Sequence, residues 1–146
     1  MKSQRTGGYL ISKINQVTGR IFNKFLKEYD IEINRAQGKI MFALWKTDSI
    51  TIKELGKETA LSKSTMTPML DRLEKMGYIK RVPSKTDRRE ILIELTEKDK
   101  LMQETYIEVS QKMGKIFYKD FTTQEKDDFE KYLERILSNL TTFESE

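Results

Sequence analysis

The sequence predicts a mainly α-helical protein that contains one small β-hairpin, an α+β variation on a helical fold. Three observations support this fold class. Apolar residues recur at helical spacing along most of the chain, only two prolines interrupt it, and the period changes to that of β-strands in one short region. The length of 146 residues suits one domain, or one core with an attached arm, and is enough for a hydrophobic interior.

The composition excludes several kinds of chemistry. The chain has no cysteine and no histidine, so it cannot form disulfides, thiolate zinc sites or nucleophile–histidine catalytic pairs. It also shows no glycine-rich phosphate loop, so we expect neither an enzyme nor a metal or cofactor. The basic N-terminus is not followed by an apolar run of signal-peptide or membrane-span length, which predicts a cytoplasmic protein without a membrane partner.

Positive charge is concentrated in the first two-thirds of the chain. The formal net charge is +4, but residues 1–50 carry +5 and residues 51–90 carry +4, whereas residues 120–146 carry −5. A polyanionic partner for the middle of the chain is therefore plausible, although a run of charge is often only a solvated face.

The first two helices are expected over residues 9–29 and from residue 35 to about residue 46. Apolar residues cover an arc of the first helix that is wider than one packed side needs, so we expect it to be covered from two directions. Asn34 is the expected N-cap of the second helix, whose Ile40 and Leu44 face inward.

Two short helices follow. Thr51 and Glu54 form a capping-box pattern that opens a helix over residues 52–59. Ser62 can cap the next helix, and Gly77 supplies its left-handed stop. The side chains expected to face inward from this helix are Met66, Met69, Leu70, Leu73 and Met76. Two helices separated by so few residues have the spacing of a helix-turn-helix.

The outward face of the second short helix could meet a polyanion. Small polar residues near its N-terminus, such as Ser64 and Thr67, can approach base edges and phosphates, although they could equally serve only to cap the helix. Pro68 removes one backbone hydrogen bond and crowds the carbonyl of Ser64. Either the helix begins at Thr67 with Pro68 in its first turn, or its first turns are kinked.

A basic β-hairpin is expected next. Residues 78–82 and 90–95 alternate like strands, and residues 83–89 form a polar, basic tip. Asp87 precedes Arg89 by two residues, so on a tight turn it can hold the guanidinium in one orientation. Such an arginine loses less entropy when it enters a minor groove. The alternative is an ordinary turn residue among solvated arginines.

Two long helices are expected to close the chain. Residues 96–99 should cap the first, and Thr122 and Glu125 form a capping box for the second. The apolar stripes of the first and last helices have no obvious partner in a small domain. A second copy of the chain would bury them, whereas the alternative is that they pack within one monomer.

These motifs together resemble the MarR family of transcriptional regulators. The resemblance is carried by residues 52–56, 61–67 and 70–79, and by the spacing Asp87-x-Arg89-x5-Leu95-Thr96. It implies a homodimer with a winged helix-turn-helix lobe over residues 34–96. It also implies dimerisation helices within residues 1–33 and 97–146.

The resemblance implies DNA-binding residues. The major groove or its flanking phosphates would receive Lys63, Ser64, Thr65, Thr67, Pro68 and Arg72. Arg89, steered by Asp87, would enter the minor groove, with Lys85 and Arg88 on the backbone. The partner would be double-stranded DNA, a pseudo-palindromic operator read by recognition helices roughly 34 Å apart.

A small effector, often phenolic or aromatic and anionic in this family, would release the repressor from its operator. The candidate ligand-binding residues are Tyr9, Phe22, Met41, Trp45 and Met66, although Trp45 and the methionines could be ordinary core. The alternative function is a winged-helix module for nonspecific DNA binding or protein assembly.

Four features depart from the family pattern. The chain lacks the cysteine that peroxide sensors in the family use and the histidines that zinc-responsive members need. Pro68 occupies a position often held by a basic residue. Asp99 stands where the family usually has glycine, and we expect it to be a solvated acid at a helix start.

Overall fold

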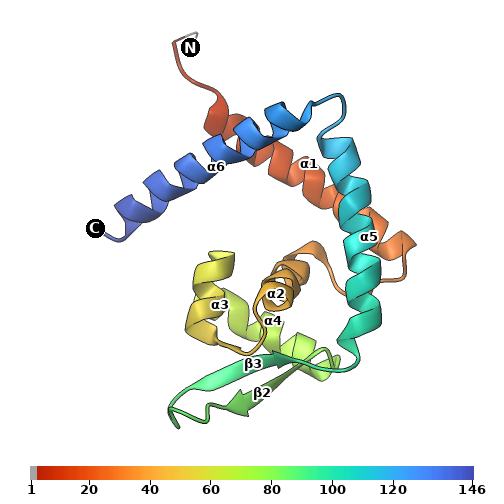
Figure 1. Ribbon diagram of the computed structural model, residues 1–146, viewed down its shortest axis with the longest axis vertical. Coiled ribbons are helices and arrows are strands. Elements are labelled where there is room, and N and C mark those ends of the chain that lie inside the picture. Colours follow the sequence, from red (N-terminus) through yellow and green to blue (C-terminus); the bar gives the residue numbers. More distant parts are fainter. Residues whose placement is uncertain (1–2) are drawn as a thin grey trace. The chain divides into compact units, whose positions relative to one another are not determined.

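The structure, a computed structural model, describes residues 3–146 (Figure 1). Its elements in chain order are α1 (Gly7–Glu28), α2 (Arg35–Lys46), β1 (Ile50–Thr51), α3 (Ile52–Thr59), α4 (Lys63–Lys75), β2 (Ile79–Pro83), β3 (Ile91–Leu95), α5 (Asp99–Phe117) and α6 (Thr123–Glu144). The chain forms two compact units, Met1–Ser110 and Gln111–Glu146, and α5 runs from the first into the second. None of the helices in the described residues is long and apolar enough to cross a membrane.

Local features of the chain explain where α2 and α4 begin and where α4 ends. The Asn34 side chain accepts the Gln37 backbone N–H at 2.9 Å, and the Gln37 side chain accepts the Asn34 N–H at 3.0 Å, which is a complete capping box. Ser62 caps α4 as predicted. Gly77, with φ of +88°, ends α4, because glycine adopts this left-handed conformation without steric cost.

The start of α3 differs from the prediction in one detail. Thr51 caps the helix by accepting the Glu54 N–H at 3.1 Å, but the Glu54 carboxylate accepts the Thr51 hydroxyl rather than its backbone N–H. Thr51 is also the last residue of β1, where it pairs with Leu92, so its backbone is part of the sheet. Strand β1 was not predicted, because two residues are too few to show an alternating pattern.

The sheet is antiparallel, with the strand order β1-β3-β2. The hairpin register runs from Ile79 opposite Leu95 to Pro83 opposite Ile91. The first strand is displaced by one residue from its predicted range of 78–82, and the second begins one residue later than predicted and ends at Leu95 as predicted. Pro83 is tolerated because it is the last residue of an edge strand, where it need not donate to the ladder.

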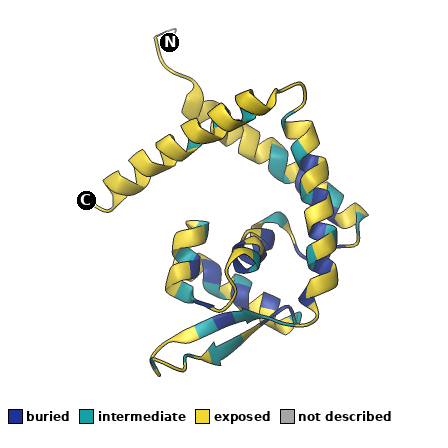
Figure 2. Cartoon of the chain, viewed as in Figure 1, coloured by how far each residue is buried: buried dark blue, intermediate teal, exposed yellow. Residues whose placement is uncertain are grey.

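The core of the first unit lies where α2, α3, α4 and the sheet meet (Figure 2). Its fully buried side chains include Ile40, Leu44, Leu55, Met66, Leu70, Leu73 and Ile93. In α1, Phe22 and Leu26 are buried, but apolar residues of the N-terminal half, from Tyr9 to Val17, are exposed. The structure therefore does not show the predicted cover on both sides of this helix within one chain.

The second unit holds the end of α5 and all of α6. Thr122 and Glu125 form the predicted capping box. The Tyr118 hydroxyl donates to Glu130, and burial together with this hydrogen bond raises the pKa of Tyr118 to about 12. No residue of α6 is buried, and its exposed large apolar side chains are Tyr132, Ile136, Leu137, Leu140 and Phe143.

Candidate nucleic-acid interface

Helix α4 presents an exposed polar face. Lys63 and Ser64 in its first turn and Arg72 in its last turn are exposed, whereas Met66 and Leu70 are buried in the core. Two of the predicted contact residues also make local hydrogen bonds. Thr65 Oγ1 accepts the Ser62 hydroxyl at 2.9 Å, and Thr67 Oγ1 donates to the Lys63 carbonyl at 2.8 Å. Both hydroxyls therefore help to organise the helix start and keep further capacity to accept hydrogen bonds.

Pro68 lies inside α4. The helix begins at Lys63, so the predicted alternative in which it begins at Thr67 is wrong. Pro68 has no N–H, and the carbonyl of Ser64 therefore lacks its usual intrahelical donor. Both residues are exposed, which lets solvent or a ligand supply that hydrogen bond.

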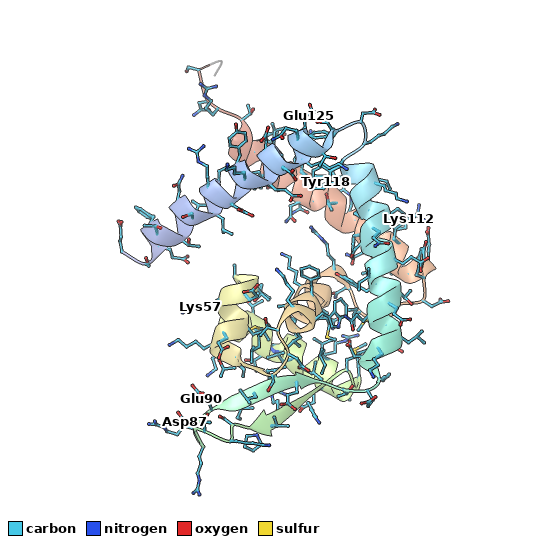
Figure 3. The ribbon with its side chains drawn as sticks, in the orientation of Figure 1. Lys57, Asp87, Glu90, Lys112, Tyr118 and Glu125 are labelled. Atoms are coloured by element: carbon cyan, nitrogen blue, oxygen red, sulfur yellow. The ribbon has the colours of Figure 1, made fainter. Side chains whose placement is uncertain are left out.

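The tip of the hairpin is a tightly bonded turn. The Ser84 N–H donates to the Glu90 carbonyl at 3.0 Å, and the Ser84 hydroxyl oxygen accepts the N–H groups of Thr86 and Asp87, both at 3.2 Å. Asp87 and Glu90 lie at the end of the hairpin in Figure 3. These bonds give a short, highly charged loop a defined backbone.

Asp87 holds Arg89 in two ways. Its Oδ1 accepts the Arg89 backbone N–H at 3.0 Å and lies 3.3 Å from Arg89 Nε. The Arg89 side chain is 91% exposed. The contact engages Nε, so the terminal amino groups of the guanidinium take no part in it and remain able to donate to another partner.

Arg81 is a residue that the sequence analysis did not single out as an ion-pair partner. Its guanidinium leaves β2 for α4, where Nη1 lies 2.7 Å from Glu74 Oε1 and Nη2 lies 2.8 Å from Asp71 Oδ1. This bridge joins the hairpin to α4 by two charge-assisted hydrogen bonds. The sequence signal for this bridge was the spacing of Asp71 and Glu74, which places both acids on one face of the helix, followed by Arg81 on the next strand.

The base of the hairpin is joined to the end of α4. Lys98 Nζ donates to the Met76 carbonyl at 2.7 Å and lies 4.7 Å from the centre of the Tyr78 ring. The Thr96 hydroxyl donates to the Gly77 carbonyl. Because α5 begins only at Asp99, Thr96 is not its N-cap, and that prediction is wrong.

Asp99 is buried rather than solvated, contrary to the prediction. Only 2% of the residue is exposed, and its two carboxylate oxygens lie 3.0 and 2.9 Å from the indole nitrogen of Trp45. Burial raises the pKa of Asp99, the Trp45 hydrogen bond acts in the opposite direction, and the charge of Asp48 raises it further. The first residue of α5 therefore points inward, to α2.

The five predicted ligand-binding residues do not form one site. Met41 and Met66 are fully buried, as core residues are, and Tyr9 is 68% exposed. Phe22 and Trp45 both contact the ring of Tyr106, with centroid distances of 5.4 and 5.2 Å. Burial raises the pKa of Tyr106 to about 12.

A cavity of about 320 Å³ lies instead between α1 and α2. Its lining residues are Asn15, Gln16, Gly19, Arg20, Asn23, Arg35, Ala36 and Lys39. Arg35 is fixed there, because its Nη1 donates to Asn15 Oδ1 at 2.9 Å and its backbone N–H donates to Asn23 Oδ1 at 2.8 Å. The lining is amide-rich and basic and contains no acid. Within residues 3–146, no group of three or more His, Cys, Asp or Glu side chains could hold a metal ion.

Comparison with known proteins places these features in a family. The model of the MarR family matches residues 33–91. The transcriptional regulator SarZ of Staphylococcus haemolyticus is 31% identical over 118 residues, which cover 81% of this chain and 78% of SarZ. The organic hydroperoxide resistance transcriptional regulator of Bacillus subtilis is 35% identical over 79 residues, 54% of each chain.

Solved structures agree with this result. A mutant MarR from E. coli complexed with operator DNA has a TM-score of 0.79 and 30% identity, covering 89% of this chain and 92% of its own. AbfR of Staphylococcus epidermidis has a TM-score of 0.76 and 30% identity, covering 92% and 90%. Another structure shows reduced AbfR bound to DNA, with a TM-score of 0.70 and 26% identity, covering 90% and 88%. The predicted fold class, mainly α with a winged helix-turn-helix, is confirmed.

Proposed function

The chain belongs to the MarR family of DNA-binding transcriptional regulators, and from this membership we propose that it acts as a dimeric repressor, released from a pseudo-palindromic operator by a small ligand. The observation that carries the DNA-binding part is the orientation of Arg89 by Asp87 at the tip of the wing, the β2–β3 hairpin. A fixed, exposed guanidinium suits insertion into a minor groove, where negative potential is strong.

The wing and α4 would divide the work of recognition. Lys63, Ser64, Thr65, Thr67, Pro68 and Arg72 would meet the major groove or its phosphates. Lys85 and Arg88 are exposed on the wing and would contact the backbone beside Arg89. Phosphate contacts position the protein, whereas contacts inside the grooves give specificity. Arg88 and Arg89 are adjacent in the chain, but we expect Arg88 to make a phosphate contact and Arg89 to make a groove contact.

The exposed apolar side chains of α1 and α6 support the dimer. Each helix leaves a stripe of large apolar residues uncovered, which is unusual for a monomer. Dimerisation helices within residues 1–33 and 97–146 would bury these stripes against a second copy. Removal of residues 122–146 is then expected to abolish the dimer, as measured by sedimentation equilibrium.

The experiment on DNA compares Arg89→Ala with Arg88→Ala. On an operator duplex selected by the wild type, Arg89→Ala should weaken binding by about 1–3 kcal/mol. It should also reduce the difference in affinity between the operator and random DNA. Arg88→Ala should weaken binding to both duplexes alike and lower the salt slope by about one. Equal behaviour of the two variants, with the fold intact, would contradict the proposed groove contact.

The α1–α2 cavity favours an anionic effector. Arg20, Arg35 and Lys39 contribute three cations and the asparagine and glutamine side chains contribute hydrogen-bonding groups, so the lining suits a polar anion better than an aromatic ring. A ligand can release DNA only if it binds one conformation of the dimer more tightly. Titration of citrate or a phenolic carboxylate into the DNA complexes of the wild type and of Arg20→Ala, with release of DNA as the readout, distinguishes a polar anionic effector from an aromatic one. Release by the phenolic compound alone, unaffected by Arg20→Ala, would contradict this assignment.

The alternative module for nonspecific DNA binding or protein assembly makes a different prediction. It expects affinity that hardly depends on sequence, and in the assembly case a shallow salt slope, because phosphate contacts make DNA binding strongly salt-dependent. The same titrations on operator and random duplexes therefore distinguish it from the repressor.

A further inference from the structure

Asp99 and Trp45 join the first residue of α5 to the C-terminal end of α2. Both carboxylate oxygens of Asp99 lie within 3.0 Å of the indole nitrogen, and the carboxylate is almost completely removed from solvent. Only residues 96–98 separate Asp99 from the end of β3. The bond therefore lies at the point where the chain leaves the wing and enters the long helix α5.

The same two helices remain in contact two turns further along. Tyr106 of α5 lies with its ring 5.2 Å from that of Trp45, at 63°, and its hydroxyl lies so close to Gly38 of α2 that a Cβ there would overlap it. Trp45 and Gly38 are seven residues apart, as are Asp99 and Tyr106. Two residues of α5, two turns apart, therefore contact α2, and the Asp99–Trp45 bond fixes one end of the contact.

Stability alone does not explain a carboxylate at this position. Burial penalises the charged form, and Asp48 adds repulsion, while the indole N–H and the N-terminus of α5 compensate in part. The pKa of Tyr78 is raised mainly by burial and further by the negative charges of Glu32 and Asp99. An apolar side chain would avoid these costs but could not accept the Trp45 N–H.

We propose that Asp99 is a positioning residue for operator binding: by accepting the Trp45 N–H, it fixes the direction in which α5 leaves the DNA-binding lobe and so sets the separation of the two recognition helices. This inference rests on the proposed dimer. A lobe that turns about the start of α5 keeps its own wing and helix α4 intact. Loss of the Asp99–Trp45 bond should therefore lower the affinity for DNA that both lobes must contact. It should leave unchanged the affinity for DNA that contacts only one lobe.

The test compares two duplexes and three variants. One duplex is the operator selected by the wild type, and the other is the same duplex with one half-site scrambled. Asp99→Ala removes the acceptor, Trp45→Phe removes the donor, and Asp99→Asn keeps an acceptor without the charge. Affinities come from the anisotropy of labelled DNA, and circular dichroism verifies the fold of each variant.

We expect Asp99→Ala and Trp45→Phe to lose about tenfold in affinity for the full operator, within the usual range of conformational coupling, and to bind the half-site duplex as the wild type does. Asp99→Asn should retain operator affinity. Trp45 is the single tryptophan of the chain, so its emission reports the bond directly: it should shift in Asp99→Ala and remain near the wild-type position in Asp99→Asn.

Equal losses on both duplexes would show a merely structural role and overturn the proposal. An unchanged preference for the full operator in Asp99→Ala and Trp45→Phe would also overturn it, while leaving the dimeric repressor intact. A wild type that binds both duplexes equally would instead overturn the dimeric proposal and, with it, this one. Because the two variants remove opposite partners of one bond, a folding defect in either leaves the other decisive.

Discussion

Replacement of Arg81 by methionine removes the guanidinium that joins the wing to α4 and keeps an unbranched apolar side chain. In the structure, the two terminal nitrogens of Arg81 lie 2.7 and 2.8 Å from carboxylate oxygens of Glu74 and Asp71. The Arg81 side chain is 22% exposed, so these bonds are partly shielded from water. We expect the variant to be less stable and to bind DNA more weakly.

The magnitude follows from the exposure of the partners. Solvent-exposed ion pairs contribute about 0.2–1 kcal/mol each. The side chains of Asp71 and Glu74 are 63% and 41% exposed, so neither pair can exceed this range by much. Two pairs sharing one partly shielded guanidinium should together contribute about 1–2 kcal/mol to the free energy of unfolding. The variant also leaves two carboxylates uncompensated beside the proposed DNA-binding face of α4.

Urea unfolding followed by Trp45 fluorescence measures this difference. Lys80→Met is the matched control, because Lys80 is the exposed neighbour of Arg81 in β2 and its loss removes the same charge. Arg81→Lys should recover part of the stability, since an ammonium group cannot bridge both acids as a planar fork does. If Arg81→Met and Lys80→Met unfold at the same urea concentration, the bridge does not stabilise the protein and our reasoning is refuted.

Three further predictions concern the core and the α2–α5 contact. Burial raises the pKa of Asp99 above its ordinary 3.8. The stabilising contribution of the Asp99 carboxyl is therefore present at low pH and is lost as the pH rises through the raised pKa. Asp99→Asn should unfold at a higher urea concentration than the wild type at pH 7 but not at pH 3. Gly38→Ala should cost about 1–3 kcal/mol, because its methyl group overlaps the Tyr106 hydroxyl; an unchanged urea midpoint would contradict that packing. Leu70→Ala, at a fully buried site, should lower the free energy of unfolding by about 2–5 kcal/mol in the same assay. A smaller loss of stability would mean that α4 moves to fill the space left by the removed side-chain atoms.

The features predicted correctly from the sequence are those determined by near neighbours in the chain. The caps of α2, α4 and α6 depend on side chains three residues apart, so Asn34, Ser62 and Thr122 could be identified without tertiary information. The contact between Asp87 and Arg89 is local in the same sense. Motifs of this kind also carried the resemblance to the family.

The features that were missed depend on residues far apart in sequence. Strand β1 exists because Ile50 and Thr51 pair with β3, about forty residues later. The burial of Asp99 depends on Trp45, fifty-four positions earlier, and could not be read from a pattern typical of solvated helix starts. The α1–α2 cavity depends on tertiary structure in the same way, because its lining combines residues such as Asn15 and Arg35 that are twenty positions apart.

Selection of bound duplexes from a random pool with the wild-type protein tests whether a dimer reads a two-fold operator. We expect an enriched inverted repeat whose half-site centres lie about 10 base pairs apart, one helical turn, so that two α4 helices reach the same face of the DNA. A pool that shows no enriched sequence after repeated rounds, from protein that is folded and binds DNA, would contradict the claim.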